Sequence, residues 1–197
     1  MTPLPRLLVL TDAAQAMRGG HDLRAVLVRA TEAGPLGVVV RERHLAPVER
    51  RDLVLWVQAL LAEVGGALVV ASPPVEPGQS THLTAAEPAP VARPPVLGRS
   101  CHGAGELRAA AAEGCDYATL SPVFPTASKP GYGPPLGVDA LRRPPLPVYA
   151  LGGVTVDNAA HCRAAGATGV AVMGAVMGAP DPARAASELL AAVGARP

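Results

Sequence analysis

Short apolar runs recur along the chain at regular intervals, each rich in valine, leucine or alanine and bounded by glycine or polar residues. Runs of four to six such residues are typical of strands that are buried on both faces, because a helix needs a longer stretch. The pattern predicts eight strands, over residues 6–11, 36–41, 66–71, 81–84, 96–100, 117–121, 148–151 and 169–173.

Helical spacing of apolar residues separates most of these runs. After Asp22, the residues Leu23, Val26 and Leu27 fall on one helical face, and Pro47 begins an amphipathic stretch of about 18 residues. Further helices are predicted near 105–113, 158–165 and from Pro182 onward.

Three other segments differ from this alternation. Residues 72–80 and 85–95 are too short and too rich in proline to form normal helices, so the helices of these two units are predicted to be eroded. Residues 122–136 read as a long irregular loop, and loops of that length are usually functional or disordered.

Strands that alternate with helices indicate a parallel sheet covered on both faces. Eight such units predict a single (β/α)8 barrel domain over residues 1–197. An open doubly wound sheet is the alternative. Its nucleotide-binding form would carry G-x-G-x-x-G after the first strand, where this chain has TDAAQA.

Composition narrows the possible partners. Charged residues make up 17% of the 197 residues, the formal net charge is +1 and aromatic residues make up 3%. This balance favours neither nucleic acid nor an anionic membrane as a partner. We expect no spanning helix and no signal peptide. Three cysteines without metal-ligand spacing, Cys101, Cys115 and Cys162, indicate a reduced, cytoplasmic protein.

Glycines end the last two predicted strands, just before helix starts. Free N–H groups and a helix N-terminus at such a place favour phosphate, and the ends of strands seven and eight form the phosphate site of many barrels. The candidate phosphate-binding residues are Gly152, Gly153, Met173 and Gly174. The alternative is that the glycines only turn the chain.

Charged and polar residues follow other strands. Arg41 and Arg43 are two apart after strand two, so both can face the barrel mouth and bind an anionic substrate, unless they are a solvated surface pair. Ser100 and His102 share a face after strand five, where an imidazole could move a proton near neutral pH. Cys101 lies on the other face and is expected to be a small buried residue.

Lys129, the only lysine of the chain, lies on the long loop after strand six. An ammonium there could close over a phosphate or a carboxylate. A surface lysine without a function is the alternative.

Several motifs together resemble the thiamine phosphate synthases and the related thiazole tautomerases. The similar segments are LLVLTD at 7–12, VVVRER at 38–43, HLTAAE at 82–87, LGRSCH at 97–102, GCDYATLSPVFPTASKPG at 114–131, and the last two strand ends, ALGGVTVDN and GVAVMGAV. The resemblance implies a barrel, often a homodimer, that binds a phosphorylated thiazole. It adds Ser121 and Thr126 to the candidate substrate-binding residues.

The chain departs from the synthase pattern where the family binds Mg²⁺. The family has an Asn-Asp pair after strand three and an aspartate after strand four, whereas this chain has Ser72-Pro73 and only Glu87. Val39 and Arg43 replace the Gln and Lys of the strand-two motif. The resemblance therefore favours a tautomerase that needs no metal or other cofactor and aromatises a thiazole carboxylate phosphate by proton transfer.

Two alternatives to the tautomerase stay open. One is a Mg²⁺-dependent synthase with Glu87 as a ligand, and the other is a barrel that binds a thiazole or thiamine phosphate without turnover. A tautomerase of this family can carry its catalytic histidine where this chain has Pro122. His102 is therefore the expected acid/base, with Ser100 and Lys129 as helpers.

Overall fold

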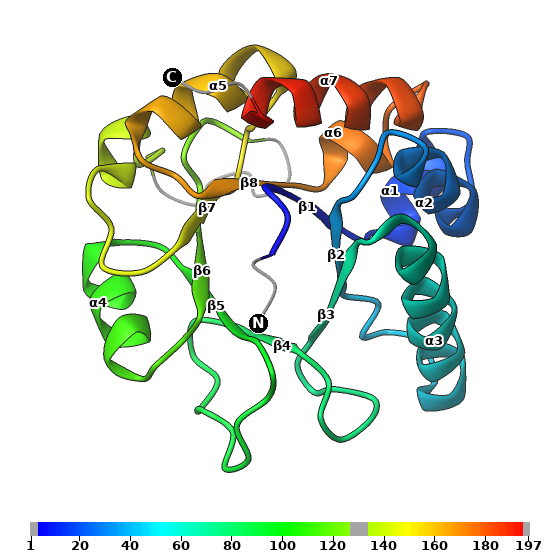
Figure 1. Cartoon of the computed structure of the whole chain (residues 1–197), viewed down its shortest axis with the longest axis horizontal. Coiled ribbons are helices and arrows are strands. Elements are labelled where there is room, and N and C mark those ends of the chain that lie inside the picture. Colours follow the sequence, from blue (N-terminus) through cyan, green and yellow to red (C-terminus); the bar gives the residue numbers. More distant parts are fainter. Residues whose placement is uncertain (1–3, 127–133, 195–197) are drawn as a thin grey trace.

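Eight parallel strands form a closed barrel in the computed structural model, which describes residues 4–126 and 134–194. Each strand pairs with the next one along the chain, and β8 pairs with β1. Figure 1 shows the strands around the centre and the helices outside them. The strands are β1 (Leu7–Leu10), β2 (Gly37–Val40), β3 (Ala67–Ala71), β4 (Thr81–Leu83), β5 (Leu97–Cys101), β6 (Tyr117–Leu120), β7 (Val148–Ala150) and β8 (Gly169–Val172). The predicted (β/α)8 barrel is confirmed, and each strand boundary lies within one residue of its prediction.

Helices follow most of the strands. They are α1 (Ala13–Arg18), α2 (Leu23–Thr31), α3 (Pro47–Val64), α4 (Ala104–Ala112), α5 (Val156–Ala165), α6 (Gly174–Met177) and α7 (Pro182–Gly194), with a 3-10 helix η1 (Val138–Leu141) before β7. The Asp22 carboxylate accepts the N–H groups of Arg24 and Ala25 at the start of α2. Helices α1 and α6 were not predicted, because six and four residues are too few to show helical spacing.

Loops stand in place of helices after β3 and β4, as the proline-rich sequence predicted. Two buried arginines lie against these loops. Arg50, on α3, donates hydrogen bonds to the carbonyl oxygens of Ala71 and Pro73. Arg99, on β5, donates to the carbonyl oxygens of Thr84, Ala85 and Glu87. These guanidiniums satisfy loop carbonyl groups that a helix would have satisfied internally.

Replacement of Arg99 by methionine should destabilise the barrel. Arg99 is 4% exposed, and its guanidinium also donates to Glu113 at 2.6 Å. Methionine would fill part of the volume but would leave three loop carbonyl groups without a donor. We expect a loss of roughly 3 kcal/mol in unfolding free energy and a fall of about 10 °C in Tm. Thermal unfolding measures this, with Arg142→Met as the control, because the Arg142–Asp139 pair is exposed. An equal Tm for both variants would contradict the role of Arg99.

Large side chains fill the interior of the barrel below the strand ends. The inward-facing cluster is Leu8, Leu10, Val39, Val69, Tyr117, Tyr149 and Ala171. A Cβ atom on Gly98 would lie 2.2 Å from the ring of Tyr117, so only glycine fits opposite this tyrosine. The Tyr149 hydroxyl donates to the carbonyl oxygens of Leu4 and Pro5, which precede β1. The interior is therefore packed toward the N-terminal ends of the strands.

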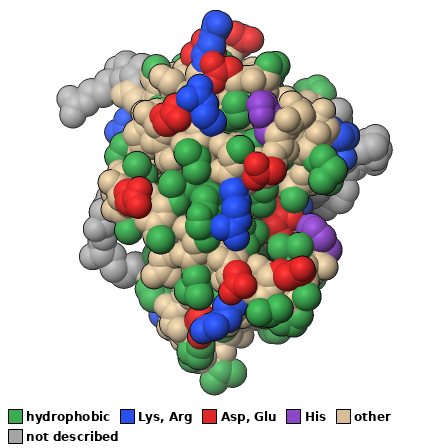
Figure 2. Space-filling model, turned by 90° about the vertical axis from the view of Figure 1, so that its right-hand side faces the viewer, with side chains coloured by type: hydrophobic (Ala, Val, Ile, Leu, Met, Phe, Trp, Pro, Cys, Tyr) green, Lys and Arg blue, Asp and Glu red, His purple; other side chains and the backbone are tan. Residues whose placement is uncertain are grey.

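The outside of α1, α2 and α3 carries charges of both signs among apolar side chains (Figure 2). Arg29 on α2 pairs with Glu32, the residue just after that helix, and both side chains are about half exposed. The Arg24 guanidinium stacks over the Trp56 ring at 4.7 Å. No helix in the described ranges is both long and apolar enough to span a bilayer.

Candidate functional site

A cavity of about 830 Å³ opens at the C-terminal ends of the strands. It brings together every residue of the described part of the chain that was predicted to bind or act on substrate. The residues that line it include Arg41, Arg43, Ser100, His102, Ser121, Thr126, Gly152, Gly153, Met173 and Gly174. Glu87, the conditional metal ligand, lies outside that lining, and Lys129 lies outside the described residues.

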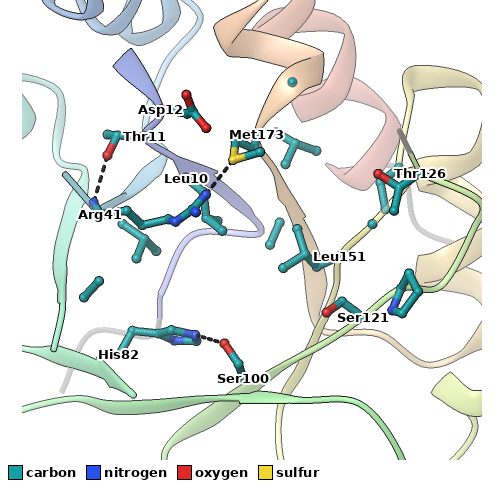
Figure 3. A pocket seen from close by; sticks show the side chains of 18 of the residues that line it. Leu10, Thr11, Asp12, Arg41, His82, Ser100, Ser121, Thr126, Leu151 and Met173 are labelled. Atoms are coloured by element: carbon teal, nitrogen blue, oxygen red, sulfur yellow. Dashed lines mark hydrogen bonds between the residues drawn. The ribbon is translucent and has the colours of Figure 1, made fainter. Parts of the chain in front are cut away.

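Arg41 reaches across the cavity from the end of β2 (Figure 3). Its backbone N–H donates to the Thr11 hydroxyl at 2.8 Å, and its guanidinium donates to the sulfur of Met173 after β8. Thioether sulfur is a weak acceptor, so an anionic ligand would readily replace it. Arg43 also lines the cavity, but its guanidinium lies 3.5 Å from the carboxylate of Glu87.

The ends of β7 and β8 present backbone N–H groups to the cavity. In the described ranges, the N–H groups of Gly153, Gly174 and Ala175 donate to no protein acceptor. α5 begins at Val156 and α6 at Gly174, so both helices have their N-terminal ends beside the cavity. This arrangement of donors suits a phosphate group.

Packing gives the two glycines after β7 a second role. Gly152 and Gly153 have φ values of 88° and 65°, which favour glycine. A Cβ atom on Gly152 would come within 2.8 Å of Pro122, and one on Gly153 within 2.3 Å of the carbonyl oxygen of Pro125. These glycines therefore also let the segment after β6 lie against the end of β7.

His102 is held at the cavity wall by the end of β6. Its Nδ1 lies 2.8 Å from the Ser121 carbonyl oxygen, which can only accept a hydrogen bond. Nδ1 therefore carries a proton, and Nε2 of the neutral ring carries the lone pair. The backbone N–H of His102 donates to Glu106 at 2.6 Å, which fixes the start of α4. This geometry suits an acid/base group, although the sequence did not indicate Ser121 as its partner.

Ser100 pairs with a different histidine, His82 at the centre of β4 (Figure 3). His82 Nε2 lies 2.9 Å from the Ser100 hydroxyl, and Nδ1 lies 2.9 Å from the hydroxyl of Tyr117. Burial, followed by the charge of Arg43, lowers the pKa of His82 to about 4. The imidazole is therefore neutral near pH 7, and a chain of hydrogen bonds runs from the cavity into the barrel.

Acid should destabilise the protein through His82. The folded-state pKa is about 4, whereas an unfolded histidine has a pKa of about 6.5. Below that value the unfolded state binds a proton that the folded state does not, so stability falls as the pH drops from about 6.5 to 4, by roughly 3 kcal/mol in total. Urea unfolding at pH 4.5 and 7.5 measures this. His82→Gln should remove most of the difference, whereas His161→Gln, on the exposed face of α5, should keep it. An equal pH dependence in both variants would contradict this account.

Carboxylates near the cavity are engaged by other groups. Buried Glu42 accepts the N–H of Ala13 at 3.2 Å. Asp12 caps α1 by accepting the N–H of Gln15. Glu87 accepts the N–H of Thr84 at 2.6 Å. Burial raises the pKa of Glu87, but the bonds from Thr84 and the charge of Arg43 outweigh burial and lower the pKa overall.

These carboxylates do not fit a Mg²⁺ ion held by the protein, which would need accessible oxygen ligands in octahedral geometry. At the end of β3, the carbonyl oxygens of Ala71 and Pro73 accept from the Arg50 guanidinium, a cation that would repel a metal ion. In the described ranges, no three His, Cys, Asp or Glu side chains come close enough to hold a metal.

Cys101 is buried, as predicted, and is not a nucleophile. Burial, followed by the charge of Glu106, raises the pKa of its thiol to about 12. A thiol of such a high pKa carries almost no thiolate near pH 7.

Three residues that line the cavity were not predicted from the sequence: His82, Thr11 and Glu42. His82 appeared only within the HLTAAE segment. The alternation of Thr81, His82 and Leu83 could have indicated it, because a single inward-facing histidine on a short strand has to find partners inside the barrel. No comparable signal marked Thr11 and Glu42, whose partners lie on other elements.

Known proteins resemble this chain in sequence and in fold. A family model described as thiamine monophosphate synthase matches residues 78–176. A putative thiamine-phosphate synthase of Geobacter sulfurreducens is 37% identical over 94% of this chain and 92% of its own length. A thiamine-phosphate synthase of Chloroflexus aurantiacus is 35% identical over 95% and 92%.

A solved structure adds to this resemblance. The thiamine phosphate pyrophosphorylase from Pyrococcus furiosus superposes with a TM-score of 0.82 at 26% identity, over 96% of this chain and 95% of that one. Long alignments above 30% identity, together with a barrel of the same topology, leave no doubt about ancestry: the chain belongs to the thiamine monophosphate synthase family.

Proposed function

We propose that this barrel catalyses the synthase reaction, the joining of a pyrimidine diphosphate to a thiazole phosphate to form thiamine phosphate. The observation that carries the proposal is the cavity, which combines two cationic side chains on one side with free N–H groups on the other. A volume of about 830 Å³ leaves room for two heterocycles. The names of the relatives, which span nearly the whole chain, support the same reaction. This replaces the tautomerase as the first candidate.

The two substrates would bind at different strand ends. The phosphate of the thiazole would lie against the N–H groups after β7 and β8, near Gly153 and Gly174. The diphosphate of the pyrimidine would lie near Arg41 and Arg43 after β2, where a guanidinium can bind phosphate oxygens through two parallel hydrogen bonds.

The reaction forms a bond between the thiazole nitrogen and the methylene carbon of the pyrimidine. The bond from that carbon to the diphosphate oxygen breaks, and the diphosphate leaves with the electron pair. Negative charge therefore develops on the leaving group, and Arg41 and Arg43 are placed to stabilise it. The carboxylates of the described residues do not fit a resident Mg²⁺, so no step is assigned to one.

Thiazole tautomerisation is the second candidate. His102 favours it, because an imidazole at the cavity wall with a defined tautomer is suited to moving a proton. The carboxylates near the cavity already accept hydrogen bonds from backbone N–H groups, which also agrees with a reaction that needs no metal. Against it stands Pro122, which occupies the place of the tautomerase histidine in the strand-six motif.

Turnover assays with two substrate sets distinguish the candidates. Thiazole phosphate with the pyrimidine diphosphate should yield thiamine phosphate and free diphosphate, and the assay is run with Mg²⁺ and with EDTA. Thiazole carboxylate phosphate alone tests aromatisation. Aromatisation without condensation would overturn the proposal in favour of the tautomerase. Binding of thiamine phosphate without any turnover would leave a non-catalytic binder.

A homodimer, which the family resemblance implies, stays a prediction. Light scattering on the purified protein checks it, since a monomer has a mass of 19.9 kDa.

A further inference from the structure

Ser100, His82 and Tyr117 form a chain of two hydrogen bonds. Which group donates in each bond follows from the protons that the three side chains carry. Tyr117 is 1% exposed, and its hydroxyl has His82 Nδ1 as its partner. Burial raises the pKa of Tyr117, so the phenol keeps its proton. His82 is a neutral imidazole, so one ring nitrogen donates and the other accepts.

Only two placements of the protons in this hydrogen-bonded chain are possible. In the first, Tyr117 donates to Nδ1, and Nε2–H donates to the oxygen of Ser100. In the second, Ser100 donates to Nε2, and Nδ1–H donates to the oxygen of Tyr117. The second leaves the Tyr117 proton without an acceptor, since in the described ranges its hydroxyl has no partner besides His82. An unsatisfied buried donor disfavours that arrangement by roughly tenfold or more.

The first arrangement fixes what Ser100 offers to the cavity. The N–H of His82 occupies a lone pair of the Ser100 oxygen, so the Ser100 hydrogen turns toward the cavity that the residue lines. We propose that His82 and Tyr117 are positioning residues that make Ser100 a hydrogen-bond donor to an acceptor atom of the bound substrate. That the acceptor belongs to a substrate rests on the proposed function, whereas the direction of the chain does not.

The packing around Tyr117 keeps its hydroxyl directed at His82. Gly98 leaves the space that the Tyr117 ring occupies, and the Tyr149 ring meets it edge-on, with centroids 5.6 Å apart and an interplanar angle of 80°. His82 lies on the strand next to Gly98, in register with it. The phenol therefore has little freedom to turn away from His82, and the tautomer of the imidazole follows from the barrel packing.

The substrate atom that accepts the Ser100 hydrogen has one of two sources. It is either a heteroatom of a substrate heterocycle or an oxygen of the diphosphate. Ser100 is on β5, whereas the N–H groups suited to phosphate follow β7 and β8. Arg41 and Arg43, which would meet a diphosphate, follow β2. Binding of inorganic pyrophosphate and of the unphosphorylated thiazole alcohol to the Ser100→Ala variant separates these sources.

The tautomer is measured directly by NMR on protein labelled with ¹⁵N-histidine. Long-range proton–nitrogen correlations near pH 7 should show His82 with its proton on Nε2, and the signal is assigned by its absence in His82→Gln. In Tyr117→Phe the ring still fills the space beside Gly98, but Nδ1 loses its donor. We expect a mixture of both tautomers in that variant.

The second readout is affinity measured by calorimetry, for thiamine phosphate, which carries both rings, and for inorganic pyrophosphate, which stands for the diphosphate. The changes below are expected for whichever of these two ligands supplies the acceptor atom. Ser100→Ala should weaken binding by about tenfold, and Ser100→Thr, which keeps the hydroxyl, should restore most of it. Tyr117→Phe should weaken binding by roughly threefold, because Ser100 then turns toward His82 in part of the population.

Tyr149→Phe is the matched control, since it removes a buried phenol that donates to Leu4 and Pro5 instead. It should change neither the tautomer nor the affinity. A wild-type His82 with its proton on Nδ1, or a Tyr117→Phe variant that matches Tyr149→Phe in both readouts, would overturn the proposal. The NMR result does not depend on turnover, so a failure of the proposed synthase activity would be seen separately.

Discussion

The Gly174→Asp variant is expected to lose phosphate binding, by about 100-fold or more in affinity for thiazole phosphate. The carboxylate would lie at the first residue of α6, among the N–H groups that face the cavity. Two like charges brought together at a binding site cost several kcal/mol, and about 2.7 kcal/mol corresponds to 100-fold. Calorimetric titration with thiazole phosphate measures the change.

Folding should survive this substitution. A Cβ atom on Gly174 would lie 3.0 Å from Oε1 of Gln15, the far end of a flexible side chain that can move. A carboxylate in the first turn also agrees with the helix dipole. Gly174→Ala is the control, because it adds the Cβ atom without the charge and should stay within about fivefold of wild type. Unchanged affinity in Gly174→Asp would place the phosphate elsewhere.

The His102→Ala variant is expected to separate the two candidate reactions. If the barrel aromatises a thiazole carboxylate phosphate, loss of the imidazole should lower that rate by roughly 10²–10⁴-fold. Joining the two heterocycles forms a C–N bond without a proton transfer in that step, so the condensation rate should change by less than about tenfold. The rates of both reactions, measured on the same preparation, test this.

Matched controls make the His102 result specific. His161→Ala removes an exposed imidazole from α5 and should leave both rates unchanged. A change in Tm would reveal whether loss of the bonds to Ser121 disturbs the end of β6. A large loss of condensation at an unchanged Tm would mean that His102 acts on the substrates of the synthase reaction directly.

For the arginines, the sequence predicted where the side chains lie but not which groups they contact. Arg41 and Arg43 were predicted to face the barrel mouth from their spacing alone, and both line the cavity. The partners were not predictable, because Met173 and Glu87 come from distant parts of the chain. Arg99 looks in the sequence like any other surface charge, yet it is 4% exposed, because the loop after β4 provides three carbonyl acceptors.

The partners of the histidines in the site were likewise not predictable from the sequence. Alternation along β5 correctly placed Ser100 and His102 on the face that lines the cavity. It could not show that Ser100 pairs with His82, or that His102 pairs with Ser121. Both pairings are set by the lateral register of parallel strands, such as Gly98 opposite His82, which strand periodicity leaves undetermined.

By itself, the sequence determined the eight strands, the two eroded helices and the strand ends that carry polar residues. Short apolar runs and proline-rich intervals act locally, so their consequences can be predicted without the fold. Only the tertiary structure decided which carboxylates are already engaged, which arginines are buried and how Tyr117, His82 and Ser100 form one chain. Those features depend on the register and closure of the barrel, which bring together donors and acceptors from distant segments.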